Sequence, residues 1–389
     1  MVTCIDPFYP DLAEFESLLV VDALVTDENL SGYVRLSRTV SKADENPEKV
    51  TGAMVTITDD DGSVYPLTET KAGEYRTDTL TFRGEPGKSY TLYIRTSEGN
   101  EYQSKSCLMH PVTDIDSIYY RKDTDMTGTG GETQAGVRFF IDSGEEGVNP
   151  YFRWTYEEWW KFHVPEVKKF DYLNDSTIIP VNNLKATCWA YRKSDKILID
   201  SKITYFPSGF RQKAIAFLPT DQSSRFTIQY CMVVKQLSVS ADEYEFWSNM
   251  QQINESGGDI FEKQPFPVNS NVYNLRNSSE PVLGYFQVSS VKQKRIYVKD
   301  RDITDMGLPC YMYDCGRIEK GEVDYVSVTP PGVTFDKIYG WYTSSGYAFI
   351  EPLFTVQGKL LRLVFVPDLC ADCTLSGSLT KPDFWVDLD

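Results

Sequence analysis

Apolar and polar residues alternate in short segments along most of the chain, and this alternation predicts β-strands. In one such segment Ala53, Val55 and Ile57 share a face, which is the period of two expected for a half-buried strand. A run of aspartates ending at Gly62 then supplies a turn, because Asp and Gly tolerate positive φ angles. Strand-like segments separated by turns at intervals of roughly eight to twelve residues predict an Ig-like β-sandwich over residues 18–108.

Residues 109–389 continue in strand-like segments, with one marked exception. Ser240 and Glu243 have the spacing of a capping box, in which a hydroxyl and a carboxylate satisfy the free N–H groups of the first helical turn. Apolar residues then recur at helical spacing, which predicts one helix near residues 241–256. Because 389 residues exceed what one core usually organises, we expect a mostly β protein with the sandwich followed by a larger β-rich domain. Residues 1–17, rich in proline and acidic side chains, are predicted to form an extended leader.

The charge balance narrows the classes of partner. Lys and Arg number 39 against 56 Asp and Glu, which gives a net charge of −17. Such a surface repels phosphate backbones, so we expect no nucleic-acid partner. No run of apolar residues approaches the roughly 18 that a membrane-spanning helix needs.

Eight cysteines allow disulfides without requiring them. Four of them fall in two closely spaced pairs near the C-terminus, and these are Cys310, Cys315, Cys370 and Cys373. Their spacing fits two halves of a zinc site or one or two disulfides that staple a C-terminal loop. An oxidising compartment favours the disulfides, and we therefore predict no metal.

Several phrases of the second domain together resemble a known family. They are CWAYRKSDKILI, RFTIQYCMVVKQLSVSADEYEFW, GGDIFEKQPFPVNSNVYN, EPVLGYFQVSSVKQKRIYV and CADCTLSGSLTKPDFW. Their order, behind a CIDPF start and the predicted Ig-like module, is similar to the Bacteroidota outer-membrane lipoproteins of domain of unknown function 4249. The module itself resembles Ig-like or carboxypeptidase-regulatory-like domains, which generally present other parts and perform no chemistry.

The family resemblance implies a location and a partner. Cys4 would carry the lipid after removal of a signal peptide, and the protein would be anchored to the outer membrane. A TonB-dependent transporter is commonly encoded near members of this family and would be the protein partner. Acidic residues soon after Cys4 fit export to the cell surface, and the periplasmic face stays open as an alternative.

The sequence offers little catalytic machinery. Its two histidines, His110 and His163, lie in different sequence contexts, and no Gly-x-Ser-x-Gly, phosphate-binding glycine loop or His-Glu-x-x-His motif is present. We therefore predict a protein that is not an enzyme and needs no cofactor. Paired carboxylates such as Glu157-Glu158 and Glu145-Glu146 keep a carboxylate-dependent hydrolase as an alternative, because that chemistry depends on spacing across a cleft.

A cluster of tryptophans is the best candidate for a binding surface. Trp154, Trp159 and Trp160 lie in one predicted strand, and flat aromatic faces stack on sugars or anchor protein interfaces. Alternation places Trp159 and Trp160 on opposite faces, so one should point outward unless both faces of the strand are buried. The function predicted first is an accessory lipoprotein of a TonB-dependent nutrient transporter. A free-standing surface lipoprotein that binds a glycan or peptide is the second hypothesis.

Overall fold

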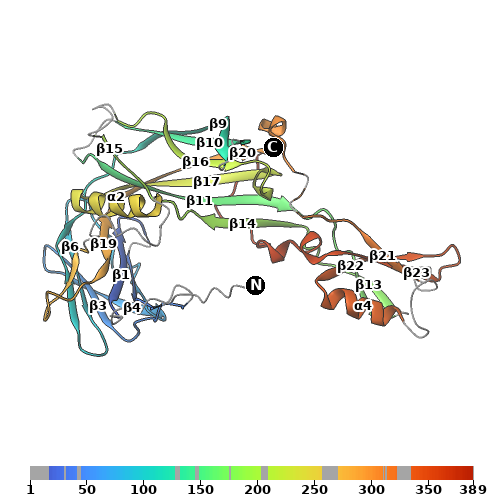
Figure 1. Ribbon diagram of the computed structural model, residues 1–389, viewed down its shortest axis with the longest axis horizontal. Helices are drawn as coiled ribbons and strands as arrows, with labels where there is room; N and C mark the ends of the chain where they lie inside the picture. The colour runs from blue at the N-terminus through green and yellow to red at the C-terminus, as the bar shows by residue number, and fades with distance from the viewer. Residues whose placement is uncertain are drawn as a thin grey trace, which may run out of the picture.

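The computed structural model describes the greater part of the chain and is mostly β, as the sequence predicts (Figure 1). The described residues are 17–29, 32–41, 45–127, 132–144, 149–174, 177–202, 209–255, 270–309, 311, 313–321 and 334–388. No helix within these ranges is long and apolar enough to cross a membrane.

Ten strands form the first sheet, which winds around one core. They are β1 (Leu19–Thr26), β2 (Gly32–Arg38), β3 (Met54–Asp59), β4 (Val64–Lys71), β5 (Glu74–Thr77), β6 (Ser89–Arg95), β7 (Glu101–Ser104), β8 (Cys107–Leu108), β18 (Val272–Asn274) and β19 (Leu283–Ser289). Their order is β18-β7-β6-β3-β4-β5-β2-β1-β19, with β8 beside β6. Alternate residues of β1 point inward, and every strand on this path contributes to one hydrophobic cluster.

Two strands of this sheet come from far along the chain, which changes the predicted domain boundary. The sequence predicts that residues 18–108 are complete in themselves, but residues 272–289 return and add β18 and β19 to opposite ends of the strand order. β19 runs parallel to β1, with Val21 beside Gly284. Residue 108 therefore marks where the chain first leaves the sheet, and 109–389 is not one separate domain.

A second unit consists of two sheets packed face to face. The smaller has the order β16-β10-β9, and the larger has the order β14-β11-β17-β20 with β15 beside β11. The bounds are β9 (Ile115–Thr127), β10 (Glu132–Ser143), β11 (Tyr151–His163), β14 (Thr187–Lys193), β15 (Leu198–Ser201), β16 (Lys213–Pro219), β17 (Gln229–Ser238) and β20 (Val291–Lys299). Fully buried side chains such as Phe139, Trp154 and Tyr230 come from both sheets and fill the space between them, as in a β-sandwich. The short 3-10 helices η1 (Ser224–Phe226), η2 (Asp300–Asp302) and η3 (Thr304–Met306) flank this unit.

The predicted helix is present as α2 (Ala241–Glu255), between the first sheet and the sandwich (Figure 1). The Ser240 hydroxyl accepts the N–H of Glu243 at 3.1 Å, so the first half of the predicted capping box is confirmed. The second half is wrong, because the Glu243 carboxylate turns into the protein and accepts Trp247 Nε1 at 3.3 Å. On the same helix Phe246 packs against Tyr285 of the first sheet, with ring centres 4.8 Å apart.

The remaining elements form a lobe at the end of the long axis opposite the first sheet (Figure 1). We call it the distal lobe, and it consists of β12 (Phe170–Asn174), β13 (Thr177–Pro180), β21 (Ile318–Gly321), α4 (Phe335–Ser344), β22 (Tyr347–Phe354), β23 (Leu360–Pro367), η4 (Asp368–Cys370) and η5 (Cys373–Leu375). Its three-stranded sheet has the order β21-β23-β22, and β12 pairs with β13. The sequence did not lead us to expect α4, whose first turn is capped by the hydroxyl of Thr334.

Candidate functional site

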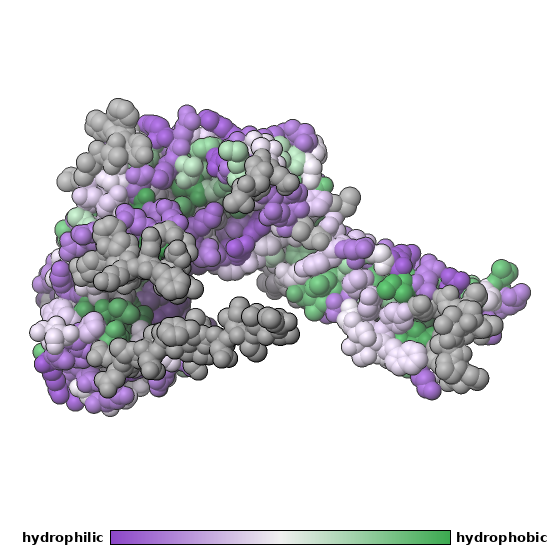
Figure 2. Space-filling view, viewed as in Figure 1, coloured by the Kyte–Doolittle hydropathy of each residue, from purple (hydrophilic) through white to green (hydrophobic). Residues whose placement is uncertain are grey.

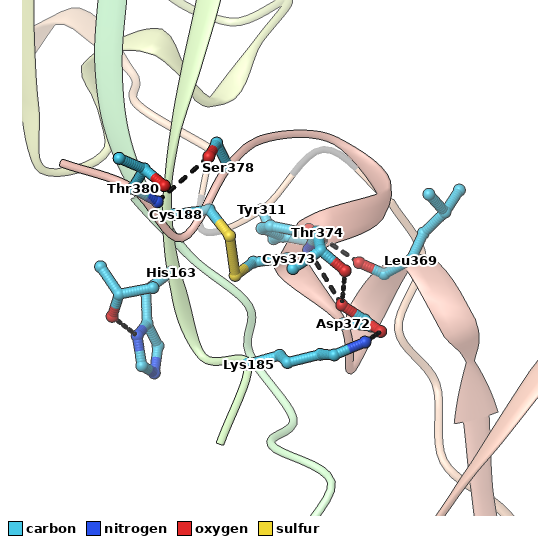
Figure 3. The surroundings of a disulfide bond; sticks show 11 residues. His163, Lys185, Cys188, Tyr311, Leu369, Asp372, Cys373, Thr374, Ser378 and Thr380 are labelled. Carbon is cyan, nitrogen blue, oxygen red and sulfur yellow. Dashed lines mark hydrogen bonds and ion pairs between the residues drawn. A yellow bond between two sulfur atoms is a disulfide. The ribbon is translucent and has the colours of Figure 1, made fainter. Parts of the chain in front are cut away.

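Two disulfides fix the base of the distal lobe. Cys188 of β14 bonds to Cys373 of η5 (Figure 3), and Cys315 bonds to Cys370 of η4. The sequence grouped Cys315, Cys370 and Cys373 as possible partners, but the partner of Cys373 comes from the sandwich. A sulfur in a disulfide is not a thiolate, so these three residues do not form the alternative zinc site. The other two cysteines singled out from the sequence, at positions 4 and 310, lie outside the described residues.

A cleft of about 400 Å³ opens in the distal lobe beside these disulfides. Its walls come from four parts of the chain: the segments flanking the β12–β13 hairpin, helix α4, the start of β22, and the η4–η5 turn. Its charged and aromatic lining comprises Lys168, Asp171, Lys185, Tyr339, Tyr347, Phe349, Asp368 and Asp372. A smaller cavity of about 200 Å³ lies beside α2, so the lobe holds the larger hollow.

Two ion pairs organise one side of the cleft. Lys168 Nζ lies 2.5 Å from Asp171 Oδ1. Lys185 Nζ lies 2.5 Å from Asp372 Oδ2, and Figure 3 shows this second pair. Burial on its own would raise the pKa of Asp372, but hydrogen bonds from Lys185 and Thr374 outweigh it and hold the pKa below its ordinary value. Asp372 is therefore a stable anion and a poor proton donor.

Asp368 is the third carboxylate of the cleft, and it has a different environment. Its Oδ1 accepts the N–H of Leu369 at 2.7 Å, and its own N–H donates to the carbonyl of Gly346 at 2.9 Å. Within the described ranges Oδ2 has no hydrogen-bond donor and no cation as a partner. This oxygen is available to a ligand.

The aromatic side chains of the cleft are held by their neighbours. The Tyr339 ring stacks on Tyr172 with centres 4.9 Å apart, and the Tyr347 ring meets Tyr342 edge-on at 5.5 Å. Both lining tyrosines are half-buried, so each also keeps part of its surface toward solvent. Fixed ring faces beside polar groups are the usual composition of a small-ligand site.

The three tryptophans singled out from the sequence lie elsewhere, in β11 of the sandwich. Trp154 is 0% exposed in the core. Trp159 packs against Tyr191 and the C-terminal Phe384, with ring centres 4.5 and 5.5 Å away. Trp160 is half-buried and donates its Nε1 hydrogen to a serine of η1 at 3.2 Å. Of the two alternatives weighed from the sequence, the structure matches the one in which both faces of the strand are covered, because β11 has the sandwich core on one face and the C-terminal tail on the other.

The carboxylates and histidines considered for catalysis are also placed. Glu158 is 2% exposed and pairs with Arg225 at 2.7 Å, which makes it a structural ion pair. Glu145 and Glu146 lie outside the described residues. His163 Nδ1 is 3.0 Å from a threonine hydroxyl of β14, and the ring does not line the cleft (Figure 3). Three carboxylates share the distal cleft, and two of them are held by lysines.

Sequence reasoning missed the cleft because its residues are far apart along the chain. Lys185 and Tyr339, for example, are brought together only by the folding of the lobe. The available signal was the position of Asp368 and Asp372 beside Cys370 and Cys373, since disulfides fix the backbone on which those side chains stand.

Comparisons with known proteins point to a family without an assigned activity. The family model described as "Domain of unknown function (DUF4249)" matches residues 5–295. The matched range excludes the C-terminal phrase ending at Trp385, which contributed to the resemblance noted from the sequence. A search among curated proteins found none that matches. The solved structure titled "Biofilm associated protein - BSP domain" is 8% identical over 93% of this chain and 80% of its own, with a TM-score of 0.16, which carries no argument about fold.

Proposed function

We propose, on the premise that this chain belongs to the DUF4249 family, that it is a non-catalytic lipoprotein of the outer membrane. It holds a ligand in its distal lobe and serves as the accessory partner of a TonB-dependent nutrient transporter. Cys4 carries the lipid anchor, and the protein faces the cell surface.

The observation that carries this proposal is the disulfide-fixed lobe with its cleft. Disulfides persist in oxidising compartments, so the pairs Cys188–Cys373 and Cys315–Cys370 support a location outside the cytoplasm. They also hold the η4–η5 wall of the cleft in place, which lowers the entropic cost of ordering a binding site. A fixed, concave and partly polar surface is suited to binding.

The exposed apolar residues on the outer surface of the distal lobe support the proposal of a protein partner. Figure 2 shows hydrophobic atoms on the distal lobe beside its polar surface. Large apolar side chains that are well exposed there include Leu173, Ile179, Trp341, Phe354 and Val356. Several exposed apolar residues on one small lobe favour contact with another protein, whereas scattered single residues would need no explanation.

The second candidate is a surface lipoprotein that binds a glycan or peptide without a fixed membrane partner. Tyr339 and Tyr347 favour it, because aromatic faces beside carboxylates are suited to either ligand. The two candidates differ in whether a transporter is bound.

The first test is affinity isolation of the lipidated protein from detergent-solubilised native outer membranes, followed by mass spectrometry. We expect a stoichiometric TonB-dependent transporter with the wild-type protein and its loss with the double variant Trp341→Ser and Val356→Ser. Leu80→Ser is the matched control, because Leu80 is also exposed but belongs to the first-sheet unit. Recovery of the protein without a transporter would favour the second candidate.

The anchor is tested separately. We expect radiolabelled fatty acid to be incorporated into the full-length precursor and lost with Cys4→Ala, together with release of the protein from the membrane. Unchanged membrane attachment of that variant would contradict the lipoprotein assignment.

A further inference from the structure

The charges that line the distal cleft do not balance. Lys168 is paired with Asp171 and Lys185 with Asp372, so both cations are already satisfied within the protein. Asp368 is left over, and two lysines against three aspartates give the charged lining a net charge of −1. An unbalanced carboxylate in a confined space attracts a positive group, because its charge is less screened there than on an open surface.

The local backbone adds to this negative potential. Helix α4 ends at Ser344, and Asp368 N–H is bonded to the carbonyl of Gly346, two residues further on. The last carbonyl groups of a helix carry a partial negative charge and favour cations nearby. Asp368 Oδ2 therefore stands next to a helix end that disfavours anionic ligands.

Two aromatic rings share the cleft with this carboxylate. Tyr339 and Tyr347 line the same cleft, and their contacts with Tyr172 and Tyr342 keep the rings in place. The faces of aromatic rings attract ammonium groups that lie within about 6 Å of the ring centre. A carboxylate that shares a cleft with tyrosine rings thus favours a cation over a neutral hydroxyl compound.

We propose that the distal cleft binds a small polar ligand through a primary ammonium group, which pairs with Asp368 Oδ2. The two sources of this chemistry that fit a cleft of about 400 Å³ are the N-terminus of a short peptide and an amino sugar. The Lys168–Asp171 and Lys185–Asp372 pairs supply hydrogen-bonding groups for the rest of the ligand. This inference rests on the proposed function in one respect, namely that the distal lobe binds a ligand.

Isothermal titration calorimetry on the full chain tests the ammonium requirement with two matched pairs of probes. Trialanine is compared with N-acetyl-trialanine, and glucosamine with N-acetylglucosamine, because acetylation replaces the positive charge by a neutral amide and adds one small acetyl group. We expect the charged member of at least one pair to bind roughly tenfold or more tightly than its acetylated partner, the usual effect of a charge-assisted hydrogen bond. The pair that responds identifies the source.

A second arm tests the assigned carboxylate. Asp368→Asn keeps the side-chain oxygen that accepts the N–H of Leu369 and removes the charge, so we expect a tenfold or greater loss of binding with an unchanged melting temperature. Asp300→Asn is the matched control, because Asp300 also opens a short 3-10 helix and also accepts the next N–H, from Arg301 at 2.8 Å. Asp300 does not line the cleft, so the Asp300→Asn protein should bind the probe as the wild type does.

Each outcome decides the inference. Absence of binding by all four probes up to their solubility, equal binding within both pairs, or full binding by Asp368→Asn would each overturn it. Transporter recovery without ammonium binding would leave the proposed function standing and remove this inference. If the probes bind through their ammonium group but the protein is neither lipidated nor bound to a transporter in native membranes, this inference stands and the proposed function is removed.

Discussion

Glu243 is a buried carboxyl whose ionisation opposes folding. It lies on α2 with 2% of its surface exposed, and Arg153 sits over the ring of the intervening Trp247 at 4.0 Å. Burial raises the pKa of Glu243 to about 7, although the positive charge of Arg153 and hydrogen bonds from Trp247 and the Val288 N–H lower it in part. The side chain therefore titrates near neutral pH at the junction between the first sheet and the sandwich.

This pKa predicts the direction of a pH effect on stability. Between the ordinary value of 4.5 and about 7 the folded protein binds more protons than the unfolded chain, so stability falls as pH rises through this window. We expect Glu243→Gln, which cannot ionise, to remove this fall and to be the more stable protein at pH 8, by up to roughly 3 kcal/mol. Urea unfolding at pH 5, 6, 7 and 8 measures the free energy of unfolding against pH for the wild type and for the variant.

The control for this experiment is on the same helix. Glu245→Gln changes an exposed carboxylate two residues further along α2 and should follow the wild-type curve. If the free energy of unfolding of Glu243→Gln also falls with pH in parallel with that of the wild type, burial of an ionising Glu243 is not the cause of the pH dependence.

Individual residues show where sequence patterns stop being informative. The alternation in β11 correctly separates the two faces of the strand, but it does not reveal what covers each face. Trp159 is covered by Phe384, which is more than 200 residues away in the chain, and so alternation could not decide between an outward ring and a strand covered on both faces. Glu243 matches a helix-capping pattern, yet the half-buried Trp247 competes for its carboxylate.

At the scale of elements, the parallel strand β19 depends on one glycine. Gly284 has φ +85° and lies beside Val21 of β1. A Cβ atom at this position would be 2.0 Å from the Val21 carbonyl oxygen, which is a backbone atom and cannot rotate away. The close approach of these two strands therefore requires glycine.

We expect Gly284→Ala to destabilise the protein by several kcal/mol, because the strand must shift and lose part of its pairing with β1. Gly358→Ala is the matched control. Gly358 has φ +80°, and no described atom lies within 4 Å of the position that an alanine Cβ would take, so this change should cost only about 1 kcal/mol. Urea unfolding followed by tryptophan fluorescence compares the two. Equal costs would show that backbone conformation matters here and the steric contact does not.

The two helices differ in how visible they are in the sequence. Helix α2 follows a Ser240 cap and carries apolar residues at helical spacing, so its existence and start are predictable. Helix α4 has ten residues, includes Gly340, and takes its apolar character from Phe335, Ile338 and its tyrosine and tryptophan side chains, all of which are also common in strands. It is held by packing against β22, a contact that local pattern does not encode.

At the scale of the whole molecule, the mostly β class is predictable but the arrangement of units is not. Alternation of apolar and polar residues indicates β-strands wherever it occurs, and so it indicates the mostly β fold class. The return of residues 272–289 to the first sheet and the bond from Cys188 to Cys373 join segments that are far apart in sequence. Several pairings of eight cysteines satisfy the same spacing, so only the folded chain selects one.

The Cys188–Cys373 disulfide joins the distal lobe to the sandwich and sets the start of the C-terminal tail. Ser378 next exchanges two backbone hydrogen bonds of 2.9 Å with Trp189. Trp385, 4% exposed, then packs on Tyr297 of β20 at 5.6 Å between ring centres. The tail is thus fixed at both ends across the outer face of the larger sheet of the sandwich.

Removing this disulfide should therefore loosen the tail as well as lower global stability. We expect the double variant Cys188→Ala and Cys373→Ala to lose roughly 2–5 kcal/mol, because the bond closes a long loop in the unfolded chain. Hydrogen exchange with mass spectrometry should show faster exchange in residues 377–388. The double variant Cys315→Ala and Cys370→Ala removes a disulfide of shorter sequence separation and should leave the tail protected. Tail exchange as slow in the Cys188→Ala and Cys373→Ala variant as in the Cys315→Ala and Cys370→Ala variant would mean that Trp385 and its neighbours hold the tail without the Cys188–Cys373 disulfide.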